Sequence, residues 1–274
     1  MSDQTTIGVE RPLRVGVIGV GIMGSNHARV FAGLPGTELV GIADPDAKQA
    51  EFVANTLGCS AVGDVDALIS LGIDAVTVAA PTHLHRDIAM ACIARGVHVM
   101  VEKPIASTVE EGHEIISAAR RAGVTLMIGH VERFNPAVEA IKEAIRSEDI
   151  ALLQFRTASG VLAHINTNWL TPFKARSVTV ATRGKYVMGD LLTRQVTECF
   201  GFQPDGSYSM RHLSVGHAEP LRSELLAFLR AVRTGAAPAV TGEEGVASLE
   251  IATRCLASRP TAAPARKGPR AVAG

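Results

Sequence analysis

The sequence predicts an α/β domain built on a doubly wound parallel sheet, followed by an α+β domain built on a mostly antiparallel sheet. Three observations support this prediction. Short apolar runs alternate with longer amphipathic stretches between Arg14 and His130, a glycine-rich turn follows the first run, and the pattern changes after Pro136. Such alternation is typical of parallel strands joined by right-handed helical crossovers.

The first half of the chain contains five expected strands and four expected helices. The apolar runs are almost continuous, as in strands covered by helices on both faces, and they span residues 14–20, 38–44, 75–80, 98–103 and 126–130. Helices are expected between them at 25–33, 46–58, 85–96 and 108–123, and several end at a glycine suited to a left-handed cap.

The second half of the chain has a different residue pattern. After a predicted helix at 137–148, β-branched segments broken by glycine-containing turns predict antiparallel strands within 151–170, 177–190 and 194–202, and helices are expected at 219–235 and 243–258. Both ends lack apolar periodicity, which is typical of disordered tails. The predicted organisation is a tail at 1–12, a first domain at 13–135, a second at 136–258 and a tail at 259–274.

Composition excludes several classes of partner. The 27 Lys and Arg residues balance 27 Asp and Glu residues, which argues against binding to nucleic acid or to an anionic membrane and favours a small molecule. The four cysteines form no CxxC pair, so neither a metal site nor a disulfide framework is expected. No apolar run reaches the roughly twenty residues of a membrane span, and the start does not resemble a signal peptide. A soluble, cytoplasmic protein is expected.

The glycine-rich turn has the spacing GxGxxG. Gly19, Gly21 and Gly24 follow an expected strand and open an expected helix, which is the context in which this motif binds a dinucleotide. Gly19 permits a tight turn, Gly21 lets the backbone approach a pyrophosphate, and Gly24 lets the helix pack on the strand. With Ile22 and Met23, these residues form the predicted phosphate-binding loop of a Rossmann domain.

Asp44 ends the second expected strand, twenty residues beyond Gly24. A carboxylate at this place accepts hydrogen bonds from the adenosine ribose and repels a 2′-phosphate, which favours NAD over NADP. An alternative is that Asp44 and Pro45 form only a helix-capping turn.

Three further motifs make a family resemblance specific. Residues 80–85 read APTHLH, residues 102–104 read EKP and residues 129–136 read GHVERFNP. In this order they resemble the Gfo/Idh/MocA oxidoreductases, which act on sugars, inositols and sugar nucleotides with NAD(P). Residues 168–174 and 219–224 resemble segments of members that act on UDP-linked or related amino sugars.

The resemblance implies roles for the residues at the strand ends. Lys103 would lie beside the nicotinamide and the substrate hydroxyl, where an ammonium polarises the oxygen or relays a proton. Glu102 would hold the nicotinamide ribose, and Pro81, Thr82 and His85 would flank the cofactor. Outside its motif Lys103 would be read as a surface lysine, and an alternative for His85 is that it begins a helix.

Candidate substrate contacts come next along the chain. His130 is expected to contact substrate or cofactor. An almost equally supported alternative is that it is an ordinary histidine at a strand end, without a role in binding. Arg133 and Asn135 are expected to bind substrate oxygens. Lys174 is a further candidate, with an ordinary surface charge as its alternative.

One departure from the family pattern stands out. Members carry an Asp-x-x-x-His motif that supplies the catalytic acid/base, whereas this chain runs from Ile150 directly into a segment resembling the later sheet. The second domain is therefore predicted to be shortened, with Lys103, His130, His164 or Lys174 left to substitute. A homodimer through the C-terminal sheet is expected, because a shortened sheet leaves a face or edge to cover.

Two kinds of function remain open from the sequence. The first is an NAD(P)-dependent oxidoreductase acting on a sugar, sugar nucleotide or cyclitol. The second is an NAD-binding scaffold, sensor or partner subunit without that chemistry, or a reductase of a reactive carbonyl or imine.

Overall fold

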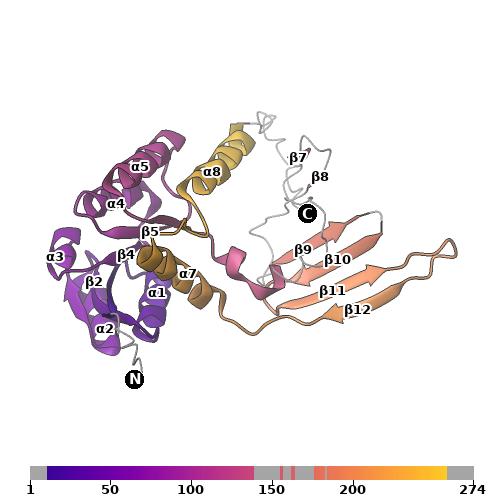
Figure 1. Ribbon diagram of the computed structural model, residues 1–274, viewed down its shortest axis with the longest axis horizontal. Coiled ribbons are helices and arrows are strands. Elements are labelled where there is room, and N and C mark those ends of the chain that lie inside the picture. Colours follow the sequence, from indigo (N-terminus) through magenta and orange to yellow (C-terminus); the bar gives the residue numbers. More distant parts are fainter. Residues whose placement is uncertain (1–10, 139–154, 157–161, 164–175, 183, 258–274) are drawn as a thin grey trace, which may run out of the picture. The chain divides into compact units, whose positions relative to one another are not determined.

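The computed structural model describes residues 11–138, 155–156, 162–163, 176–182 and 184–257, and it divides into two compact units (Figure 1). Unit 1 comprises Met1–Gly129 and Phe228–Gly274, and unit 2 comprises His130–Ala227. Of the two predicted tails, only Arg11 and Pro12 are among the described residues, and Arg11 pairs with Asp74 at 2.7 Å.

Unit 1 is built on a six-stranded parallel sheet, which confirms the predicted doubly wound fold. The strand order is β3-β2-β1-β4-β5-β6. The strands are β1 Leu13–Ile18, β2 Thr37–Ala43, β3 Ser60–Val62, β4 Ala75–Val78, β5 His98–Glu102 and β6 Leu126–Gly129. Their side chains are mostly buried because helices cover both faces of the sheet.

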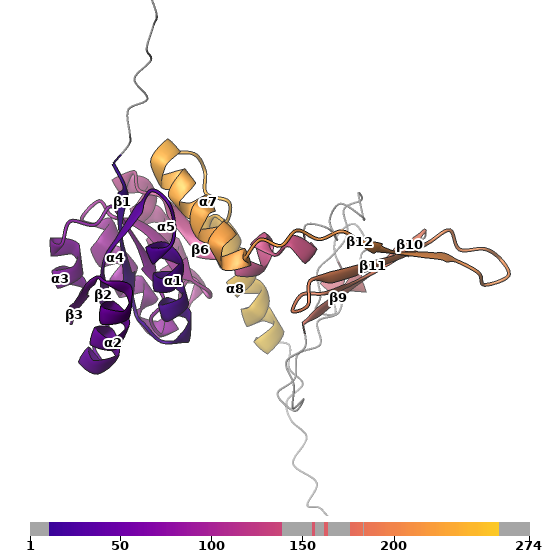
Figure 2. The same ribbon diagram turned by 90° about the horizontal axis from the view of Figure 1, so that it is seen from below.

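The helices of unit 1 form two contacting groups (Figure 2). One consists of α1 and α2, the other of α3, α4 and α5. Their bounds are α1 Ile22–Ala32, α2 Ala47–Leu57, α3 Val65–Ser70, α4 His85–Ile93 and α5 Val109–Ala122, with a 3₁₀ turn, η1, at Thr82–Leu84. Strand β3 and helix α3 were not predicted, because they are too short to produce a clear periodicity.

Two helices lie near the end of the described chain: α7 spans Pro220–Thr234 and α8 spans Gly242–Ala257. The boundary between the units falls within α7, and α8 belongs to unit 1. Helix α8 contacts α5 and β6, although the sequence analysis assigned it to the second domain. The approach is close, because a Cβ atom at Gly112 would lie 2.6 Å from Val246 and one at Gly245 would lie 2.8 Å from Ile128. Residues 242–257 therefore share the core of unit 1. None of the described helices combines the length and apolar character needed to cross a membrane.

Unit 2 contains a four-stranded antiparallel sheet, which confirms the predicted change of class. Its order is β12-β11-β10-β9, and Val180, Val187 and Val196 on one face pack in a buried cluster with Ala137. The elements are η2 Val131–Phe134, β7 Phe155–Arg156, β8 Leu162–Ala163, β9 Ser177–Ala181, β10 Lys185–Asp190, β11 Gln195–Phe200 and β12 Ser209–Leu213. Strand β12 was not predicted, and most of the helix predicted at 137–148 lies outside the described residues.

Glu198 is a buried charge on the β11 strand, with 1% of its side chain exposed. Its two carboxylate oxygens pair with Lys185 Nζ and Arg211 Nε, each at 2.6 Å. The hydrogen bond from Lys185 is the main cause that lowers the pKa of Glu198 below its ordinary value of 4.5.

We expect Glu198→Gln to destabilise unit 2 by about 1–2 kcal/mol at pH 7, because a hydrogen-bonded charge is lost. A lowered folded-state pKa gives stability that is present above the unfolded pKa and is lost as the pH falls through the folded pKa. The variant should therefore lose less stability than the unaltered chain on acidification below about pH 4.5. Urea unfolding of the full chain at several pH values tests this, and parallel stability–pH curves would contradict it.

Candidate functional site

The sheet of unit 1 reverses its strand order between β1 and β4, and the chain segments that follow these strands come together there. The Ala79 amide, just after β4, donates to the Ile18 carbonyl at the end of β1 at 2.8 Å. Lys103 follows the next strand, β5. Ligands of open α/β sheets bind at such a point, outside the carboxyl ends of the strands.

The glycine loop after β1 has the conformation that its spacing predicts. Gly19 has a φ of +84°, and a Cβ atom at Gly24 would lie 1.7 Å from the Gly19 carbonyl oxygen. A Cβ atom at Gly21 would meet nothing within 4 Å, and no side chain caps the start of α1 there. Ile22, in the first turn, is 86% exposed. The loop is therefore open at a helix N-terminus, which suits a pyrophosphate.

Asp44 lies against this loop, at the end of β2. Its Oδ2 atom accepts the Val20 backbone N–H at 2.7 Å, and its Oδ1 atom accepts that of Asp46 at 2.9 Å. The cap of α2 is Asp46, whose side chain accepts the amides of Lys48 and Gln49. Asp44 is thus not the helix cap, and its carboxylate keeps further lone pairs for a ribose hydroxyl.

The EKP segment has one buried and one exposed charge. Glu102, the last residue of β5, is buried, and its Oε1 atom lies 3.1 Å from Nε2 of His27 on α1. The other oxygen, Oε2, accepts the Lys103 backbone N–H at 3.1 Å. The Lys103 side chain is exposed beside this strand end, where its ammonium group is accessible to a ligand.

His27 was not singled out by the sequence analysis. It is 0% exposed, and it lies three residues after Gly24 on the buried side of α1. A polar residue at a position that the helical period assigns to the core is the signal that points to it.

His85 is also buried, and it is the first residue of α4. Its ring contacts two backbone carbonyl oxygens: Nδ1 lies 2.9 Å from that of Pro104 and Nε2 lies 2.8 Å from that of Ala80. The ring therefore connects the two loops after β4 and β5. Pro81 is exposed and Thr82 is half-buried on the first of these loops.

The candidate substrate residues belong to unit 2 or lie outside the described residues. His130 follows β6 directly and is half-buried, and Arg133 is exposed on η2. Asn135 is buried; its amide nitrogen donates to Glu132 at 2.8 Å and to the Leu191 carbonyl at 3.1 Å. These bonds give the Asn135 side chain a structural task within unit 2. Lys174 and His164 lie outside the described residues.

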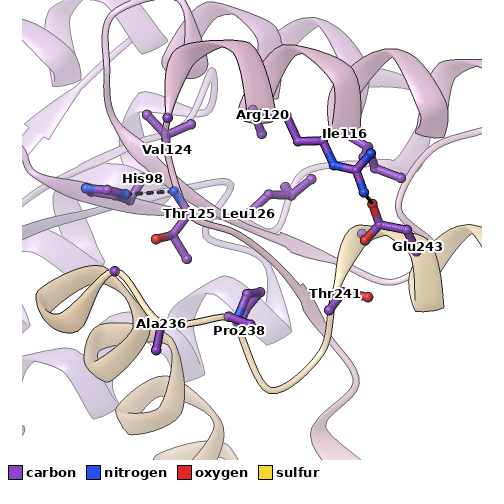
Figure 3. A pocket seen from close by; sticks show the side chains of 15 residues that line it. His98, Ile116, Arg120, Val124, Thr125, Leu126, Ala236, Pro238, Thr241 and Glu243 are labelled. Carbon is purple, nitrogen blue, oxygen red and sulfur yellow. Dashed lines mark hydrogen bonds and ion pairs between the residues drawn. The ribbon is translucent and has the colours of Figure 1, made fainter.

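A cavity of about 370 Å³ lies in unit 1 where β5 and β6 begin (Figure 3). His98 lines it, and burial lowers the pKa of His98. The Nδ1 atom of His98 accepts the Thr125 amide at 2.9 Å, and Arg120 pairs with Glu243 nearby. Because the amino ends of the strands meet here, this cavity is separate from the predicted cofactor site.

The open glycine loop, the acid after β2 and the lysine after β5 define a dinucleotide-binding Rossmann domain. Residues 13–130 match a family model described as an oxidoreductase family with an NAD-binding Rossmann fold. This domain belongs to the Gfo/Idh/MocA oxidoreductase family, which confirms the predicted family and a nicotinamide cofactor.

Curated relatives share the first half of the chain. UDP-N-acetylglucosamine 3-dehydrogenase from Acidithiobacillus ferrooxidans is 34% identical over 168 residues, covering 61% of this chain and 49% of that protein. Inositol 2-dehydrogenase 1 from Saccharopolyspora erythraea is 35% identical over 143 residues, covering 50% of this chain and 42% of that protein. In these matches, the chain spans about half the length of the relatives or less.

Solved structures share the fold over a longer range. The structure of the same Acidithiobacillus ferrooxidans dehydrogenase has a TM-score of 0.78 at 23% identity, covering 88% of this chain and 96% of that chain. Levoglucosan dehydrogenase in complex with NADH and levoglucosan has a TM-score of 0.75 at 19% identity, covering 90% and 97%. At such identities the likeness shows the fold alone.

Proposed function

We propose that the chain is an NAD-dependent oxidoreductase that transfers a hydride between nicotinamide and a hydroxyl or keto carbon of a sugar, sugar nucleotide or cyclitol. The observation that carries this proposal is the exposed Lys103 at the end of β5, on the sheet edge that also holds the open glycine loop. The substrate class follows the names of the relatives, which are dehydrogenases of UDP-N-acetylglucosamine and of inositol.

The residues fit a nicotinamide dinucleotide. The free N-terminus of α1 offers backbone N–H groups to the pyrophosphate, and Asp44 offers carboxylate oxygens to the adenosine ribose. The bound cofactor accepts or donates the hydride at its nicotinamide ring. Lys103 polarises the substrate oxygen through its ammonium group, or exchanges a proton with that oxygen at Nζ. His130 and Arg133 are proposed substrate contacts.

The proposed cofactor is NAD rather than NADP. Asp44 accepts the backbone N–H of Val20 in the glycine loop and that of Asp46 at the start of α2, so its negative charge is held near the proposed position of the adenosine ribose. A 2′-phosphate at this place would meet like charge.

The test is a binding and turnover experiment on the full chain. NADH and NADPH affinities are measured by fluorescence titration, and turnover is then assayed with UDP-N-acetylglucosamine, myo-inositol, levoglucosan and their keto forms. Turnover of at least one sugar with tighter NADH than NADPH binding is the expected result. Binding of neither nucleotide would overturn the cofactor assignment, and NADH binding without turnover would overturn the proposed hydride transfer.

A second candidate is an NAD-binding scaffold, sensor or partner subunit, or a reductase of a reactive carbonyl or imine. The observation that favours it is the missing Asp-x-x-x-His motif between the segments that resemble the family. NADH binding without sugar turnover, together with reduction of a simple imine or with no reduction at all, would support it.

We also propose that the chain forms a homodimer through the sheet of unit 2. One sheet face is buried by the valine cluster, whereas Tyr186, Met188 and Met210 on the other face are 39%, 39% and 60% exposed. We expect the unaltered chain to sediment as a dimer and Met188→Glu to shift it toward monomer, because a charge is costly in an apolar interface. A monomeric unaltered chain would contradict the proposal.

A further inference from the structure

We propose that His27 and His85 are positioning residues that hold the segment Glu102–Pro104 in place for the nicotinamide end of the cofactor. The inference rests on the proposed function, and it adds a role for two buried histidines in the proposed nicotinamide site. Neither ring is accessible to a ligand: the residues are 0% and 1% exposed. Both act through atoms of the EKP segment.

His27 connects the glycine-loop helix with the backbone of Lys103. Its Nε2 atom lies 3.1 Å from Glu102 Oε1, and since a carboxylate only accepts, the ring nitrogen is the donor. The second oxygen of Glu102 accepts the Lys103 backbone N–H at 3.1 Å. One carboxylate thus joins α1, which begins at the glycine loop, to the residue that carries the ammonium group.

The Glu102 carboxylate is enclosed as well as bonded. A Cβ atom at Gly129, on the neighbouring strand β6, would lie 3.1 Å from both Cδ and Oε1 of Glu102. A buried carboxylate is costly unless it is hydrogen-bonded, so losing the His27 donor favours a shift of Glu102 toward water. The Lys103 amide would then lose its acceptor.

His85 fixes the other end of the same segment. Its two nitrogens face the carbonyl oxygens of Pro104 and Ala80, at 2.9 and 2.8 Å. Carbonyl oxygens only accept, and the ring carries at least one N–H, so it donates to at least one of these two oxygens. The buried His85 ring therefore lies between the loop after β4 and the loop after β5 and contacts both.

Lys103 therefore combines an exposed side chain with a backbone segment that buried groups hold in place. Its side chain is exposed, whereas buried histidine rings contact the residues on either side of it. Loss of either histidine should loosen the nicotinamide half of the site. The adenosine half should keep its affinity, because the glycine loop and Asp44 supply it.

The experiment compares two ligands, NADH and ADP-ribose, which lacks the nicotinamide. Their dissociation constants are measured for the full chain and for His27→Gln, His27→Asn and His85→Phe. The Gln and Asn variants of His27 are a matched pair, because both place an amide in the buried position but only the longer side chain keeps a donor near Glu102. Thermal unfolding of each variant checks that it is folded.

We expect His27→Asn and His85→Phe to weaken NADH binding roughly tenfold, as for a lost hydrogen bond, with ADP-ribose binding changed less than about twofold. His27→Gln should stay within about threefold of the unaltered chain for both ligands. The control is His98→Gln. His98 is the first residue of β5, at the end of the strand opposite to Glu102, so this substitution should change neither the NADH nor the ADP-ribose dissociation constant.

Three results would overturn the inference. The first is equal weakening of NADH and ADP-ribose binding. The second is unchanged NADH binding by both His27→Asn and His85→Phe, and the third is identical NADH affinity of His27→Gln and His27→Asn. If the unaltered chain binds NADH but reduces or oxidises no sugar, the proposed hydride transfer fails while the positioning role still stands or falls on these ratios.

Discussion

Gly24→Ala is expected to abolish NADH binding and to destabilise unit 1. The added Cβ atom would lie 1.7 Å from the Gly19 carbonyl oxygen, and backbone atoms cannot rotate away as a side chain can. The start of α1 must therefore move from the end of β1. We expect a loss of about 3 kcal/mol or more in stability and an NADH affinity lowered at least roughly a hundredfold.

Gly21→Ala is the matched control, because it adds the same methyl group three residues earlier in the same motif. Here the Cβ atom would meet nothing within 4 Å, so stability should change by less than about 1 kcal/mol. The methyl group would nevertheless occupy the space through which a pyrophosphate approaches the backbone, and NADH affinity should fall about tenfold. Thermal unfolding and fluorescence titration separate the two effects. Normal NADH binding by Gly24→Ala would show that the loop does not have this geometry.

Lys103→Met is expected to lower turnover by about 10²–10⁴-fold on any panel sugar that the unaltered chain turns over. The substitution keeps an unbranched apolar chain and removes the ammonium group, so neither polarisation of the substrate oxygen nor proton exchange remains. Since the Lys103 backbone is held by Glu102, NADH affinity should change less than about threefold. Steady-state turnover at saturating NADH, with a separate NADH titration, is the measurement.

Lys103→Arg distinguishes the two roles proposed for this residue. A guanidinium keeps the positive charge but does not give up a proton in proteins. Partial retention of turnover would indicate that charge alone suffices, whereas a loss as large as that of the Met variant would indicate proton exchange. Full activity of Lys103→Met would remove Lys103 from the mechanism.

The expected strands and the glycine loop were predictable because their signals are local. An apolar run between polar turns is complete within five to seven residues, and GxGxxG encodes a turn and a helix start that need no distant partner. Three elements, β3, α3 and β12, were not predicted. Their pairing with a neighbouring strand or helix, rather than their own pattern, decides that they form.

The candidate site also contains residues that were identified from sequence spacing and contacts that were found only in the structure. Gly19, Gly24 and Asp44 were identified from spacing, and the structure places Asp44 on the loop of which Gly19 and Gly24 are part. Asn135 was expected to bind substrate, but its amide ties together parts of unit 2 that are 56 residues apart in sequence. No local pattern encodes such a bond.

The sequence by itself determined the change of fold class, the dinucleotide loop, the acid after β2 and the lysine after β5, because each depends on neighbouring residues and on the rule that parallel strands end at one edge. Only the tertiary structure decided that α8 packs on the nucleotide-binding unit and that His27 and His85 hold the EKP segment. These contacts join residues 75 and 19 positions apart, and the energy of burying polar groups is settled only when such partners meet.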